Sequence, residues 1–184
     1  MKTQALPGFD APAVGFEQPF EMLEACHDRV RRSLALLERL VAHVDTHGHD
    51  APSRSAAADV LRYFDLAAPL HHEDEERHVF VVLEHCGEPA LEAAIAGLHT
   101  DHVRMEALWA GLRVALTLWS VPAASGPVDP ATRHQANAFG ALYGAHLRTE
   151  ETVVFPAARS RMNAERLAQM SADMQRRRRL PASP

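Results

Sequence analysis

The sequence predicts an all-α protein folded as an up-down-up-down four-helix bundle. Apolar residues recur at helical spacing, every three or four positions, through most of the chain. They form four stretches of roughly 25–30 residues, joined by short segments in which glycine and proline break the pattern. No stretch shows the two-residue alternation of a strand. Long amphipathic helices with short connections bury their apolar faces by packing as a bundle.

The first predicted helix covers residues 20 to about 44. Its apolar stripe starts at Phe20, and Gly48 and Pro52 break the chain after it. Residues 1–19 hold three prolines and two glycines, so we expect them to form an irregular N-terminal arm.

The second predicted helix begins at about Ser53 and ends at about His85, before Gly87. Pro69 lies inside it and is expected to kink or interrupt it, because proline donates no backbone hydrogen bond and clashes with the preceding turn. The third predicted helix opens at Glu88-Pro89, with proline in the first turn, and runs to about residue 120.

The fourth predicted helix starts at Asp129-Pro130, a capping residue followed by proline, and runs to about residue 159. Asn163 is expected to cap a short fifth helix that leads into the basic run Arg176–Arg179. The chain is therefore divided into an arm (1–19), a helical bundle (20–160), and a C-terminal helix with a basic tail (161–184).

The composition is that of a globular protein, with 47% hydrophobic and 23% charged residues and a net charge of −5. An acidic balance argues against general nucleic-acid binding. No apolar run approaches the roughly 20 residues that cross a bilayer, and the first residues show no apolar signal region, so no membrane association is expected. The two cysteines form no disulfide framework, which favours a reduced, cytoplasmic protein.

Histidine is unusually frequent, at 12 of 184 residues. On the first and third predicted helices, His27 and His102 lie within the apolar stripe that faces the core. Either one alone is typical of a hydrogen-bonded core histidine. The other two long helices change that interpretation.

On the second helix, successive 100° steps place His71, His72 and Glu75 on one inward arc. On the fourth, His146 and Glu150 share the inward face in the same way. The segments themselves are alike: HHEDEERHVF at 71–80 aligns with HLRTEETVVF at 146–155. A buried carboxylate is costly unless it is paired or bound to a metal. Inward histidines on four helices, with inward glutamates on two, predict a carboxylate–imidazole metal site.

At this point the sequence resembles the hemerythrin-like HHE cation-binding family over residues 20–159. The residues that carry the resemblance are His27, His71-His72-Glu75-Glu76, His102, His146, Glu150-Glu151 and Phe155-Pro156. The resemblance implies a four-helix bundle around a non-haem di-iron centre with an oxo or hydroxo bridge.

Carried over by position, the resemblance assigns His27 and His71 to one iron and His146 to the other. It makes Glu75 and Glu150 the bridging carboxylates. His102 completes one of the two ligand sets.

The third helix departs from true hemerythrin, which has a second histidine where this chain has Glu106. We assign that ligand position to His72, with His99 and Glu106 as the alternatives. Five histidines, two bridging carboxylates and the oxo or hydroxo bridge leave about one of twelve octahedral positions open. Such a site suits iron better than zinc, although zinc or manganese can substitute.

The open position predicts a non-enzymatic di-iron protein that reversibly binds or senses O₂ or a related small ligand such as NO or peroxide. The first alternative is a di-iron oxidase, peroxidase or NO-handling enzyme in which Glu76 and Glu151 relay protons. The second is an iron- or redox-responsive interaction module whose basic run, Arg176–Arg179, docks on a protein partner. No residue is assigned a catalytic role.

Overall fold

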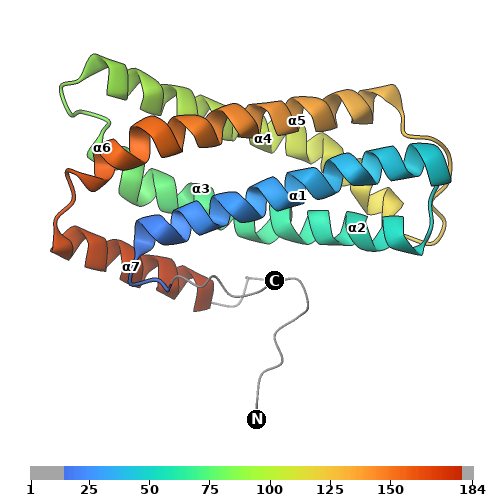
Figure 1. Ribbon diagram of the computed structural model, residues 1–184, viewed down its shortest axis with the longest axis horizontal. Helices are drawn as coiled ribbons and strands as arrows, with labels where there is room; N and C mark the ends of the chain where they lie inside the picture. The colour runs from blue at the N-terminus through green and yellow to red at the C-terminus, as the bar shows by residue number, and fades with distance from the viewer. Residues whose placement is uncertain (1–14, 180–184) are drawn as a thin grey trace, which may run out of the picture.

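In the computed structural model, residues 15–179 are described, and within that range every regular element is a helix. The all-α prediction is therefore confirmed. The parts of the predicted arm and tail at residues 1–14 and 180–184 lie outside the described residues. Figure 1 shows an elongated body of long helices lying lengthwise, with one shorter helix beneath one end.

Four helical segments and one terminal helix make up this body. The first segment is α1 (Pro19–His47), and the third is α4 (Pro89–Trp119). The second consists of α2 (Ala51–Arg62), η1 (Tyr63–Ala67), α3 (Ala68–Asp74), η2 (Glu75–Val79) and η3 (Phe80–Val82). The fourth consists of α5 (Pro130–Thr149), η4 (Glu150–Val154) and α6 (Phe155–Arg159), and α7 (Ala164–Arg179) follows.

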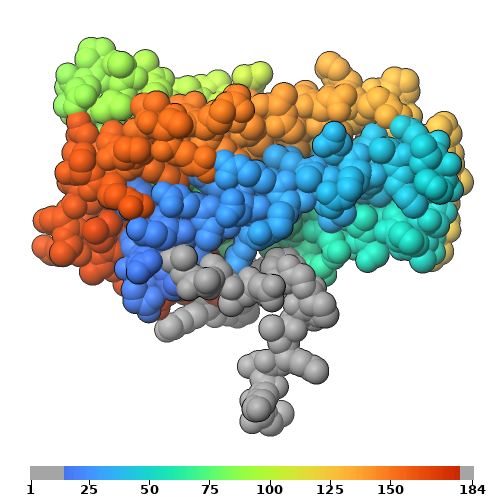
Figure 2. Space-filling model, viewed as in Figure 1, coloured from blue at the N-terminus to red at the C-terminus, as the bar shows by residue number. Residues whose placement is uncertain are grey.

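The segments pack around a common interior. Helix α1 contacts α2 and α5, and α4 contacts the same two helices. In the space-filling view the side chains of α1 and α5 meet along the face shown, so the interior is covered there (Figure 2). This arrangement is consistent with the predicted helical bundle.

Polar caps start three of the helices. The Asp50 carboxylate accepts the Ser53 N–H at 2.8 Å, so α2 begins at Ala51, slightly earlier than predicted. Asp129 caps α5 as predicted, accepting the Thr132 N–H at 2.9 Å. Asn163 does the same for α7, accepting the Arg166 N–H at 2.9 Å.

Pro69 interrupts the second segment, as predicted, but the disturbance lies ahead of it. Residues Tyr63–Ala67 form a π-helical turn that ends where the Ala68 N–H bonds to the Tyr63 carbonyl. Because Pro69 has no N–H for the carbonyl four positions earlier, a wider turn is accommodated there. The segment ends at Val82 and not at the predicted His85, as a short 3₁₀ turn closes it.

The core consists of two apolar clusters separated by a polar layer. One cluster contains Leu37, Val60 and Phe139, and the other contains Phe20 and Phe80. Along the four segments, the buried histidines and glutamates fall where the residues of one cluster give way to those of the other. The bundle therefore positions its buried polar groups in a single layer with apolar packing on both sides.

Helix α7 is tied to the bundle by buried apolar and charged contacts. Met170 and Met174 are fully buried in the second cluster. The fully buried Asp74 pairs with Arg177 and Arg178, so these two arginines of the basic run are engaged within the molecule. No helix in residues 15–179 is long and apolar enough to cross a membrane.

Replacing Arg177 tests this attachment. We expect Arg177→Ala to lower the free energy of unfolding by about 2 kcal/mol, because it removes a charged partner from a buried carboxylate. Arg176→Ala is the matched control. The side chain of Arg176 is 69% exposed, and its loss is expected to cost less than about 0.5 kcal/mol. Urea unfolding measures both values, and equal losses would contradict the assigned role of Asp74.

Candidate metal centre

Six buried polar side chains converge in the layer between the two clusters. They are His27 on α1, His71 on α3, Glu75 at the start of η2, His102 on α4, His146 on α5 and Glu150 at the start of η4. None is more than 3% exposed. All six belong to the seven ligands predicted from the sequence.

Their potential ligand atoms form two overlapping groups. The first takes one atom each from His27, His71, Glu75 and Glu150, all within 4.8 Å of one another. The second takes atoms from His102 and His146 together with the same two glutamates. Two cations placed in these groups would share both carboxylates and would each have two histidines.

Short distances confirm that the side chains point inward. The Nε2 atom of His71 lies 3.2 Å from Glu75 Oε1, and His146 Nε2 lies 3.0 Å from Glu150 Oε1. The Nε2 atom of His27 lies 3.3 Å from Glu150 Oε2. Each glutamate therefore approaches the histidine four residues before it, the spacing that puts both on one helix face.

The hydrogen bonding of this layer is incomplete. Both carboxylate oxygens of Glu75 and of Glu150 are buried without a hydrogen-bond partner, and so is Nε2 of His27 and of His71. A buried, unpaired carboxylate costs several kcal/mol, so two in contact need positive charge. The oxygen and imidazole donors fit a pair of divalent cations.

Comparison with known proteins agrees with this geometry. A family model described as the hemerythrin HHE cation binding domain matches residues 18–158. The chain belongs to the hemerythrin HHE cation-binding family. A relative from Haemophilus influenzae, named only as an uncharacterized protein, is 31% identical over 163 residues, which is 89% of this chain and 91% of the relative. The resemblance seen in the sequence is thus confirmed.

Two further carboxylates orient the histidines of this hemerythrin-family site. Glu151 Oε1 lies 2.8 Å from His27 Nδ1, and Glu76 Oε1 lies 2.7 Å from His102 Nδ1. A carboxylate behind Nδ1 keeps the proton there and leaves Nε2 free to bind a cation. The guanidinium of Arg31 holds both oxygens of Glu151 at 2.7 Å. The sequence predicts the two glutamates only as proton relays of an enzymatic alternative, and it gives no signal for Arg31.

The centre has an internal repeat. Each functional residue of the first two segments has a counterpart 75 positions later in the last two. The pairs are His27 and His102, His71 and His146, Glu75 and Glu150, and Glu76 and Glu151. The repeat extends to the rings that cover the histidines, since Phe155 stacks on His27 and Phe80 on His102.

The backbone repeats as well. Glu75 is the first residue of the π-helical turn η2, and Glu150 is the first residue of η4. A π turn inserts one extra residue into a helix and so shifts the face on which the following side chains lie. Glu76 and Glu151 thereby reach histidines on neighbouring helices. A regular period of 3.6 residues per turn does not predict this change of helix face.

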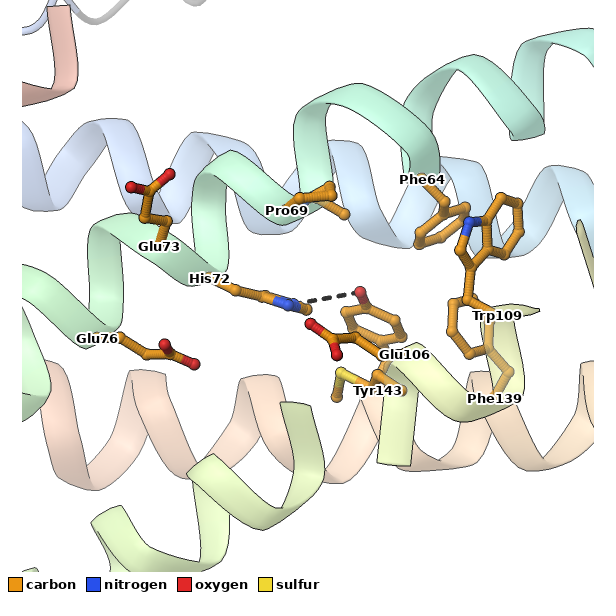
Figure 3. Close-up of a pocket in the computed structure, with 11 residues that line it drawn as sticks. Phe64, Pro69, His72, Glu73, Glu76, Glu106, Trp109, Phe139 and Tyr143 are labelled. Carbon is orange, nitrogen blue, oxygen red and sulfur yellow. Dashed lines mark hydrogen bonds between the residues drawn. The ribbon is translucent and has the colours of Figure 1, made fainter. Parts of the chain in front are cut away.

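His72 lies beside the centre and not within either group of ligand atoms. Its ring stacks on that of His102, with centroids 3.9 Å apart, and its Nε2 is hydrogen-bonded to the Tyr143 hydroxyl at 3.2 Å (Figure 3). The alternatives His99 and Glu106 are also absent from both groups. His99 pairs with Glu84 at 3.1 Å.

Burial keeps two of the histidines neutral. It lowers the pKa of His102 to about 3, and the pKa of His71 lies well below its ordinary value because of burial and the charge of His27. A neutral imidazole is the form that binds a metal ion. These two side chains are therefore ready to accept a cation at neutral pH.

Glu75 and His27 hold protons that a cation would displace. Burial and the neighbouring Glu150 charge raise the pKa of Glu75 well above its ordinary value. Burial alone would lower the pKa of His27, but the Glu150 and Glu75 carboxylates close to its Nε2 outweigh burial and raise this pKa to about 10. In the metal-free protein, His27 therefore carries the positive charge that offsets the buried Glu150 carboxylate, whose pKa lies well below its ordinary value.

Metal binding should therefore depend on pH. His27 must lose its proton to bind a cation, so we expect release of at least one proton per chain at neutral pH. Apparent affinity should rise about tenfold per pH unit from about pH 7 to about pH 9, below the pKa of His27. Calorimetric titration with Mn²⁺ in buffers of different ionisation enthalpy measures the protons released. A binding enthalpy that is the same in every buffer would show that no proton is displaced from His27 on metal binding.

The orienting carboxylates allow a matched test. Glu76→Gln removes the carboxylate behind His102 and is expected to weaken metal binding about 10- to 100-fold. Glu84→Gln is the control, because Glu84 pairs with His99, which lies outside both ligand groups. Competition with a chelator of known affinity measures both variants. A similar loss in the two would show that Glu76 has no special role.

Proposed function

We propose that this protein binds two iron ions at Glu75 and Glu150 and takes up O₂, or a related small ligand such as NO or peroxide, at positions the protein leaves open. One observation carries the proposal: two groups of buried imidazole and carboxylate atoms share both carboxylates. Such a donor set suits iron or manganese, whereas zinc prefers four-coordinate, tetrahedral sites. Bound iron would supply the redox chemistry for which the protein's own side chains are unsuited.

The number of donors supports the uptake of a small ligand. Four histidines and two bridging carboxylates occupy eight coordination positions. Two octahedral ions have about twelve, so about four remain for a solvent-derived bridge and for small ligands. This leaves more room than the seven-residue set predicted from the sequence.

The surroundings limit which ligands can reach the ions. Phe155 covers His27 with ring centroids 5.2 Å apart, and Phe80 covers His102 at 5.6 Å. With apolar clusters on both sides of the polar layer, the centre favours small, weakly polar ligands over bulk water. Reversible binding or sensing of O₂ agrees with such an environment.

A second candidate is enzymatic turnover of O₂, peroxide or NO with an external reductant. It is favoured by Glu76 and Glu151, whose side chains are 42% and 30% exposed while each contacts the Nδ1 atom of a buried histidine. Groups that reach both solvent and the centre can carry protons to it. Rapid consumption of peroxide or NO by the reduced protein would favour this candidate.

The predicted up-down-up-down order of the segments, the divisions at residues 1–19, 20–160 and 161–184, and a cytoplasmic location belong to the same proposal. They rest on the sequence pattern and on the reduced state expected of Cys26 and Cys86. Limited proteolysis tests the divisions, since cleavage near their boundaries should precede cleavage within residues 20–160.

The decisive experiment combines metal analysis with optical spectra of the full chain. We expect about two irons per chain and near-ultraviolet and visible bands that vanish on anaerobic reduction. A new, persistent band on exposure to air would support O₂ binding. Immediate return of the original spectrum would support the enzymatic candidate instead. A purified protein that cannot be loaded with iron would contradict both.

Single-residue variants test the two-group geometry. His71 belongs only to the first group, so His71→Ala is expected to retain about one iron per chain. His43→Ala is the control and should retain about two, because His43 lies outside both groups and pairs with Asp50. Full loading of the His71 variant would contradict its assignment as a ligand.

A further inference from the structure

A pocket of about 210 Å³ adjoins the metal centre without being part of it. The second segment, α4 and α5 line it, and four aromatic residues, Phe64, Trp109, Phe139 and Tyr143, form much of its wall (Figure 3). An apolar cavity of roughly 150 Å³ is large enough to bind benzene. The pocket therefore has room for a small aromatic molecule.

Only the ring of His72 separates the inner wall of the pocket from His102, a candidate metal ligand. His72 lines the pocket, and the ring of His72 stacks on His102 at a centroid distance of 3.9 Å. The Tyr143 hydroxyl, hydrogen-bonded to His72 Nε2, lies on the same wall. A molecule in the pocket would therefore contact His72, which covers the second group of ligand atoms.

Apart from the Tyr143 hydroxyl at His72, the aromatic wall is apolar. The indole N–H of Trp109 is satisfied outside the pocket by Asp65 Oδ1 at 2.9 Å. The rings pack on one another, with Phe64 and Phe139 centroids 5.0 Å apart. Packed ring faces attract both aromatic rings and organic cations.

The polar part of the pocket is acidic. Glu73, Glu76 and Glu106 contribute carboxylates, and no arginine or lysine in the described part of the chain lines the pocket. Figure 3 shows Glu106 among the side chains that line the pocket with His72 and Tyr143. Among residues 15–179, no side chain forms an ion pair or hydrogen bond with Glu106.

The internal repeat shows that this acidity is particular to one side of the centre. The counterpart of Glu106, 75 positions earlier, is Arg31, which neutralises Glu151. The counterpart of His72 is Leu147, which is buried. The pocket side thus has an unneutralised carboxylate where the other side has a cation.

We propose that this pocket binds a small aromatic amine, with its ring among the aromatic side chains and its ammonium group at Glu106. Ring stacking and cation–π attraction hold the body of the ligand, and the carboxylate selects the charge. Anionic aromatics are rejected because no cationic side chain lines the pocket. This site is additional to the metal centre, and its occupancy does not require uptake of O₂.

Three probes of equal size test the proposal on the full, iron-loaded chain. We expect benzylamine to bind saturably, with one site per chain and a millimolar or lower Kd, measured by calorimetry or by Trp109 fluorescence. Benzyl alcohol, which is neutral, should bind several-fold more weakly, and benzoate more weakly still. No saturable binding of benzylamine, or binding of benzoate as tight as that of benzylamine, would overturn the proposal.

Variants locate the site. Glu106→Gln is expected to weaken benzylamine binding about fivefold and to leave benzyl alcohol binding unchanged. Glu38→Gln, at an exposed position on α1, is the control and should change neither. Ala68→Leu, which fills the pocket wall, should weaken both probes, and a melting curve checks that it folds. If Glu106→Gln leaves benzylamine binding intact, the assigned site is wrong.

Discussion

Burial of two carboxylates at the centre of a helical bundle is the constraint on which the rest of this structure depends. Glu75 and Glu150 are fully buried, and their oxygens lack hydrogen-bond partners. Positive charge must be supplied, by a proton on His27 in the metal-free protein and by cations in the loaded one. The inward histidines, the outer carboxylates behind their Nδ1 atoms and the covering aromatic rings all serve this requirement. Stability and metal binding are therefore linked, because the groups that bind cations are also those that are costly to bury without them.

This linkage also shapes the core. A polar layer divides the apolar interior into two clusters, so neither cluster alone spans the bundle. Cations bound in this polar layer would link the four helical segments to one another, at the position between the two apolar clusters. Helix α7 strengthens one end in a different way, through the buried pairing of Asp74 with Arg177 and Arg178. Asp74 precedes Glu75 directly, so the attachment of α7 and the position of a bridging carboxylate depend on the same stretch of backbone.

Much of this arrangement can be predicted from the sequence. Helical periodicity indicates the helices, and the capping residues Asp129 and Asn163 mark the starts of two of them. Inward histidines on all four segments, together with inward glutamates on the second and fourth, identify six side chains that the structure brings together. The rest depends on features that a 3.6-residue period cannot express. The π turns at Glu75 and Glu150 redirect Glu76 and Glu151 toward neighbouring helices. His72, which the helical period places on the same inward arc as His71, stacks outside the ligand groups.

The 75-residue repeat has a consequence for the origin of the protein. Each half of the chain supplies two histidines and a glutamate to one group of ligand atoms, and the same glutamate also belongs to the other group. A tandem duplication of a two-segment ancestor accounts for this pattern, and such an ancestor would have built the centre by pairing two identical copies about a twofold axis. Once fused, the halves were free to diverge. Arg31 against Glu106 and Leu147 against His72 are such differences, and two cations bound in the centre would therefore have unequal surroundings, a condition under which the two positions can select different metals.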